Sequence, residues 1–144
     1  MSNGDDHPEA ASKHLLDAKA LLDQRRPDGA AYLSGYVIEC ALKSMWLLEK
    51  RAAPGSKMPW GRQGHEVSYL LAQVSALATV AASRTARYFG AHTSTLAKSP
   101  VSKWSPEMRY RPPVLTNADA QLYHDKASDV YHETIHQMRL DGVI

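Results

Sequence analysis

The chain has 144 residues, of which 44% are hydrophobic and 22% are charged. These fractions are typical of one globular domain with a hydrophobic core. A formal net charge of +2 and a pI near 8.7 are below the charge density that by itself indicates a nucleic-acid-binding protein, and they exclude no class of partner. Cys40 is the only cysteine, so no disulfide forms within the chain, and we expect a reducing compartment, the cytoplasm.

The N-terminal stretch MSNGDDHPEA is polar and lacks the apolar segment of a signal peptide. No window of the sequence approaches the ~18 consecutive apolar residues that a membrane-spanning helix needs. We therefore expect residues 1–7 to form a disordered tail, residues 8–144 to form a single domain, and the protein to have no membrane contact.

Hydrophobic residues at helical spacing predict an all-α fold, an up-and-down bundle of four main helices. The predicted helices cover residues 8–26, 28–51, 65–89 and 116–140. No run with the two-residue period of a strand is long enough to predict a sheet. The third and fourth helices are joined by a long loop over about 90–115, and connections of this length are usually functional or disordered.

Local signals set the ends of these helices. Pro27 breaks the pattern and Asp28 is the expected N-cap of the second helix, so the first two helices should form a tight antiparallel pair. Thr116 and Asp119 have the spacing of a capping box at the start of the last helix. In the long loop, Trp104 and Tyr110 are expected to anchor the chain to the bundle.

The second helix is the longest apolar stretch and should be contacted on two sides. One stripe consists of small and medium apolar residues that suit the bundle core. The other stripe is Tyr32, Tyr36, Glu39, Lys43 and Trp46. We expect this second stripe to face a neighbouring helix or a second subunit.

Two segments in this order, DGAAYLSGYVIECALKS at 28–44 and GHEVSYLL at 64–71, resemble the HEPN family of small prokaryotic helical domains. The resemblance covers about Leu15 to Leu77, and the last helix matches only by period and position. It implies a helical bundle that pairs as a homodimer. It also implies a partner, a nucleotidyltransferase antitoxin, in a toxin–antitoxin module. Active members of the family are metal-independent RNases, so no cofactor is expected.

The HEPN signature is an arginine followed after four to six residues by a histidine, usually near the start of the last long helix. Arg87 and His92 match this spacing, although they lie at the end of the third predicted helix and the start of the long loop, not at the last helix. The resemblance implies that they are the catalytic pair: arginine neutralises phosphate charge, and histidine moves a proton near neutral pH. The alternative is a solvated arginine at a helix end and a histidine in a loop.

The long loop contains WSPEMRYRP at 104–112, which resembles the loop of a subset of these domains. Arg109 and Arg111 flank Tyr110, and two arginines beside a tyrosine can bind a phosphate and stack on a base. Lys43 is a further candidate for phosphate contact, or else forms an ion pair with Glu39 one turn away. These residues predict an RNA- or nucleotide-binding site, with a salt-bridged, aromatic-anchored loop as the structural alternative.

Asp129, His132 and His136 share one face of the last helix at a spacing that can in principle seat a divalent metal. No fourth ligand is visible, so we expect a solvated polar face and no metal site. The two competing functions are a HEPN-type RNase and a non-catalytic HEPN bundle that binds a nucleotide or a partner protein.

Overall fold

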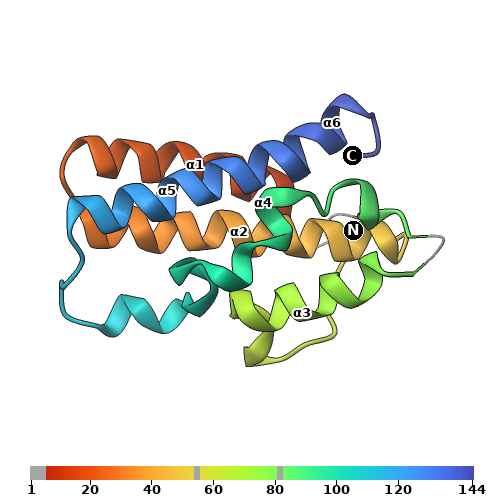
Figure 1. The fold of residues 1–144 in the computed structure, drawn as a ribbon, viewed down its shortest axis with the longest axis horizontal. Coiled ribbons are helices and arrows are strands. Elements are labelled where there is room, and N and C mark those ends of the chain that lie inside the picture. The colour runs from red at the N-terminus through yellow and green to blue at the C-terminus, as the bar shows by residue number, and fades with distance from the viewer. Residues whose placement is uncertain (1–5, 54–55, 81–82) are drawn as a thin grey trace.

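The computed structural model describes residues 6–53, 56–80 and 83–144, and it is all-α, with no strand among these residues (Figure 1). The main helices are α1 (His7–Asp23), α2 (Pro27–Glu49), α3 (Val67–Ala78) and α5 (Asn117–Tyr131). The last helix continues from α5 through a π-helical segment, His132–His136, into α6 (Gln137–Leu140). The connections contain α4 (Ala91–Ser94) and five 3₁₀ turns, η1 (Arg62–His65), η2 (Thr85–Arg87), η3 (Leu96–Lys98), η4 (Pro100–Lys103) and η5 (Pro106–Tyr110).

Helix α1 begins within the residues expected to be a disordered tail. The Asp6 carboxylate accepts a hydrogen bond from the Glu9 backbone N–H at 3.1 Å, and Pro8 lies in the first turn, where its missing N–H costs nothing. The tail prediction is therefore wrong for residues 6 and 7, and residues 1–5 lie outside the described residues.

Helices α1 and α2 form the expected antiparallel pair, but the N-cap differs from the prediction. Arg26 is the N-cap, without a side-chain hydrogen bond, and Pro27 opens the helix. The Asp28 carboxylate instead accepts hydrogen bonds from the backbone N–H groups of Val114 and Leu115, each at 3.3 Å. Asp28 therefore ties the connection before α5 to the start of α2.

Helix α2 lies at the centre of the fold and contacts α1, α3 and α5 (Figure 1). Its apolar stripe is buried as predicted at Val37, Cys40 and Ala41, whereas Leu33 and Leu48 are partly exposed. The second stripe is also covered: Tyr36 contacts Trp104, and Trp46 contacts Trp60. Connecting segments of the same chain therefore cover the face that we expected to meet a helix or a second subunit.

Helix α3 departs from the predicted bundle in length and in direction. It begins at Val67 and ends at Ala78 instead of reaching residue 89. The segment just before α3 contacts Glu39 in the middle of α2 through His65, and the segment after it contacts Glu49 at the end of α2 through Ser83. Helices α2 and α3 therefore run in the same direction, unlike the alternating order of an up-and-down bundle.

The connection between α3 and α5 is packed against the bundle by its own apolar residues. Leu96, Val101 and Trp104 are fully or almost fully buried, which confirms that Trp104 is an anchor. Tyr110 is not an anchor, because 76% of its surface is exposed. The short helical turns of this connection place η5 beside the middle of α2.

The last helix begins with the predicted capping box: Thr116 Oγ1 accepts from the Asp119 N–H at 3.1 Å, and the Asp119 carboxylate accepts from the Thr116 N–H at 2.9 Å. The apolar residues that recur at helical spacing in this helix form its buried side, except Tyr123, which is partly exposed; the buried residues are Ala120, Ala127, Val130, Tyr131, Ile135 and Met138. Within the described residues, no helix has the length and apolar content needed to cross a membrane.

Candidate functional site

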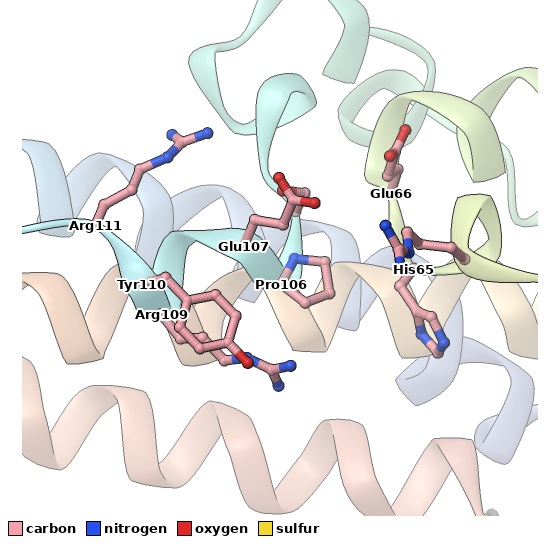
Figure 2. Close-up of a pocket in the computed structure, with 9 residues that line it drawn as sticks. His65, Glu66, Pro106, Glu107, Arg109, Tyr110 and Arg111 are labelled. Atoms are coloured by element: carbon pink, nitrogen blue, oxygen red, sulfur yellow. The ribbon is translucent and has the colours of Figure 1, made fainter.

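A surface pocket of about 520 Å³ lies between the segment before α3 and the turn η5 (Figure 2). Three arginines and a histidine give it a basic lining, and two glutamates lie at its edge. The lining residues are Arg62, His65, Glu66, Ser105, Pro106, Glu107, Arg109, Tyr110 and Arg111.

The three arginines are available to a ligand. None of Arg62, Arg109 and Arg111 forms an ion pair with a carboxylate of the described residues. The Arg109 guanidinium stacks on the Tyr110 ring at 4.8 Å from the ring centroid. In Figure 2 the side chains of Arg109 and Arg111 extend to different sides, so their charges are spread along the pocket.

Buried aromatic side chains hold η5 in place. Trp104, one residue before the pocket lining begins, is 1% exposed and contacts Tyr36 edge-on at 4.8 Å between ring centroids. The Tyr32 and Tyr36 hydroxyl groups are 3.0 Å apart, and burial, followed by this hydrogen bond, raises the pKa of Tyr36. Interaction with the Tyr32 and Tyr110 side chains raises the pKa of Arg109, so Arg109 stays charged in the pocket.

A buried ion pair lies directly behind the pocket wall. Glu39 Oε2 is 3.6 Å from Lys43 Nζ, and these two side chains are only 5% and 6% exposed. Glu39 Oε1 is 3.2 Å from His65 Nδ1, which also lies 3.5 Å from Lys43 Nζ. Burial raises the pKa of Glu39, and the positive charge of Lys43 and the contact with His65 oppose that rise.

Of the residues predicted to bind phosphate, Arg109, Tyr110 and Arg111 line this pocket and Lys43 does not. Lys43 is buried beside Glu39, and the two form the ion pair that was the predicted alternative to a phosphate contact. In this structure Lys43 therefore has a buried structural contact with Glu39 and does not line the pocket.

The predicted catalytic pair lies outside the pocket. Arg87 forms two hydrogen bonds with the Asp141 carboxylate, at 2.6 and 3.0 Å, and these raise the pKa of Arg87 and lower the pKa of Asp141. His92 Nδ1 is 3.6 Å from an Asp129 carboxylate oxygen on α5. No hydrogen bond within the described part of the chain joins Arg87 to His92. Arg87 instead pairs with Asp141, and His92 lies beside Asp129.

Sequence reasoning did not assign Arg62, His65 or Glu107 to a site. Arg62 lies in a connection rich in glycine and proline, and the sequence predicts His65 only as the first residue of a helix. These residues come together only through the tertiary fold. For example, His65 and Glu39 are separated by 26 positions in the sequence, whereas helical spacing relates only residues within a few turns.

The face of the last helix that carries Asp129 shows polar contacts within the helix. His132 Nδ1 lies 2.7 Å from the Ser128 carbonyl oxygen, and the rings of His132 and His136 are 5.4 Å apart. Across the described ranges 6–53, 56–80 and 83–144, no three histidine, cysteine, aspartate or glutamate side chains are grouped to hold a metal ion.

Comparison with known proteins gave no relative. No protein-family model matches this chain, and no match was found among curated protein sequences or solved structures. The resemblance to the HEPN family therefore rests on the sequence segments quoted above.

Proposed function

We propose that the protein binds single-stranded RNA or a nucleotide through its phosphates in the pocket between η1 and η5. The observation that carries this proposal is the set of three arginines, Arg62, Arg109 and Arg111, that line one pocket without carboxylate partners in the described residues. Arginine binds phosphate through charge-assisted, often bidentate hydrogen bonds.

Tyr110 supports a nucleotide ligand rather than a bare anion. Its ring is 76% exposed and lies beside the Arg109 guanidinium. Stacking of a base on an exposed aromatic ring contributes about 1–3 kcal/mol and tolerates any base. The separated guanidinium groups of Arg109 and Arg111 favour a ligand with more than one phosphate, such as a short strand.

The test is a binding titration of wild type with oligouridine and with AMP, alongside Arg109→Ala and Arg111→Ala. Loss of one charge-assisted hydrogen bond costs about 1.5–3 kcal/mol, so each variant should bind about tenfold more weakly or worse. Arg84→Ala is the control, because Arg84 is exposed and lies outside the pocket. Equal affinity of wild type and Arg109→Ala would refute the pocket as the binding site.

A second candidate is metal-independent RNA cleavage by Arg87 and His92. His92 favours it, because half of its side chain is exposed and the Asp129 carboxylate faces one ring nitrogen, an arrangement suited to proton transfer. Incubation with mixed RNA in EDTA tests the activity. Cleavage by wild type and not by Arg87→Ala or His92→Ala supports it; intact RNA with wild type, or cleavage by His92→Ala at the wild-type rate, contradicts it.

The homodimer and the nucleotidyltransferase partner are proposals that rest on the sequence resemblance alone. Light scattering at micromolar concentration tests the first, and a monomer mass would contradict it. Co-expression with the product of a neighbouring nucleotidyltransferase gene, followed by copurification, tests the second.

A further inference from the structure

His65 differs from the arginines of the pocket because buried charged groups of α2 hold its ring from behind. Its Nδ1 atom is 3.2 Å from Glu39 Oε1 and 3.5 Å from Lys43 Nζ, while 53% of its side chain is exposed. Glu39 and Lys43 are almost fully buried. The ring therefore has Nδ1 held against the protein interior, while the exposed part of the side chain lines the pocket.

These contacts assign the hydrogen on the ring. A carboxylate only accepts hydrogen bonds and an ammonium only donates them, and the carboxylate is nearer to Nδ1. The Nδ1–H group therefore donates to Glu39, which leaves Nε2 on the exposed edge. No hydrogen bond from the described residues reaches Nε2. In a charged imidazole both ring nitrogens are donors, so Nε2 is the position at which a second proton would be held.

The charges around His65 come from three elements. Glu39 and Lys43 face it from α2, Arg62 and Glu66 flank it on its own segment, and η5 and the residue after it contribute the remaining groups, Glu107, Arg109 and Arg111. In the empty pocket the three arginines and Lys43 oppose a further positive charge, whereas Glu39, Glu66 and Glu107 favour it. A bound phosphate adds negative charge on the side of Nε2.

We infer that His65 is a ligand-binding residue that takes up a proton when a phosphodiester enters the pocket, so that affinity rises as pH falls. This inference rests on the proposed binding function. Histidine is the side chain whose ordinary change of charge lies between pH 5 and 8, so this range is the one to test. Linkage makes the effect reciprocal: the ligand stabilises the charged ring, and the charged ring stabilises the ligand.

The experiment is calorimetric titration of the full chain with unlabelled oligouridine at several values between about pH 5.5 and 8. The phosphodiesters of this probe keep their charge over that range, so a change in affinity reports the protein. We expect wild type to bind about tenfold more tightly at the acidic end, which corresponds to one pKa unit of coupling. Titrations in two buffers of different ionisation enthalpy should show proton uptake on binding.

His65→Asn removes the titrating group at an exposed position, and His136→Asn is the matched control on an exposed face outside the pocket. We expect His65→Asn to bind with one affinity across the range, close to that of wild type at the alkaline end, and His136→Asn to behave as wild type. An unchanged pH dependence in His65→Asn, or a flat affinity in wild type, would overturn the inference.

The positioning role of Glu39 has its own readout. Glu39→Gln removes the carboxylate and leaves Lys43 in place, and its far-UV circular dichroism shows whether the bundle folds. The rise in affinity should then occur at lower pH than in wild type, because the carboxylate that favours the charged ring is gone. A rise at the wild-type pH would contradict this role.

The inference and the proposed function fail separately. Wild-type binding that is independent of pH but weakened by Arg109→Ala overturns only the protonation of His65. Absence of binding at every pH overturns both.

Discussion

The indole of Trp104 occupies the space that a side chain at Gly35 would need. A Cβ atom built at position 35 overlaps the Trp104 ring, so the absence of a side chain in the middle of α2 lets the indole lie against the helix backbone. Trp104 directly precedes the turn that carries Arg109 and Tyr110. The space left at Gly35 thus helps to fix the position of Trp104 and of the turn that follows it in the candidate site.

Gly35→Ala should therefore destabilise the protein, although alanine is the better helix former by about 1 kcal/mol. Forcing extra atoms into a packed core costs about 1–3 kcal/mol, and the indole that the new Cβ atom would meet is almost fully buried. Urea denaturation measures the free energy of unfolding. Gly61→Ala is the matched control, because a Cβ atom there meets nothing within 4 Å; equal stability of the two variants would contradict the packing argument.

Much of the helical content was predictable from residue patterns, since it depends on local spacing. The capping box of Thr116 and Asp119 and the buried face of the last helix are examples. The direction of α3 was not predictable, because it depends on a connection that returns along α2 and on the contact of Glu49 with Ser83 and Arg84. Such contacts join residues more than 30 positions apart and leave no periodic signal.

Because Glu39 and Lys43 form a buried pair, the effect of Lys43→Met on the free energy of unfolding should depend strongly on pH. Lys43→Met leaves Glu39 buried without its cation, and breaking a buried pair costs about 3 kcal/mol. Burial already raises the pKa of Glu39, and removal of Lys43 raises it further. The folded state then holds a proton that the unfolded state has released, so the free energy of unfolding falls as pH rises.

Urea denaturation at about pH 5 and pH 7.5 measures this dependence. Lys43→Met should be close to wild type at the lower pH and clearly less stable at the higher one. The double variant with Glu39→Leu should recover much of the loss, because apolar residues often replace a buried ion pair at little cost. A loss that is the same at both pH values, or that persists in the double variant, would count against the buried charge as its cause.

Asp141 should contribute stability that disappears in acid. The hydrogen bond from Arg87, followed by those from Tyr88 and Gln137, lowers the pKa of Asp141. A carboxylate with a lowered pKa stabilises the folded state above its unfolded pKa, and this contribution is lost as pH falls towards the folded value. Asp141→Asn should lower Tm at about pH 6, and its difference from wild type should shrink below about pH 4.

Differential scanning calorimetry across this range measures the effect. Asp17→Asn is the control, because Asp17 is an exposed carboxylate of α1 that is far from Asp141 in the sequence. If the two variants have the same Tm at every pH, Asp141 does not hold the last helix to the turn of Arg87. Because Arg87 is the partner of Asp141, Arg87→Ala should show the same loss of Tm.

The candidate site was predicted in part. The run of Arg109, Tyr110 and Arg111 is visible in the sequence because its members are adjacent and of a type that binds phosphate. His65 and Arg62 join it only through the fold. Arg87 and His92 have the right spacing, but the chain gives each a carboxylate neighbour from the last helix or the residues that follow it, and spacing does not report such neighbours.

The number of phosphates that the pocket neutralises should appear in the salt dependence of binding. Each arginine that contacts a phosphate of a single strand releases condensed cations, and the logarithm of affinity falls with the logarithm of salt concentration with a slope of about −0.7 per contact. Arg62, Arg109 and Arg111 together predict a slope near −2 for oligouridine. Arg109→Ala and Arg111→Ala should each make the slope less negative by about 0.7, whereas Arg84→Ala should leave it unchanged.

Tyr110→Ala should weaken binding by about tenfold or more without changing the slope, since stacking releases no ions. A slope that is unaffected by both pocket arginines would place the phosphates of the bound strand elsewhere on the protein.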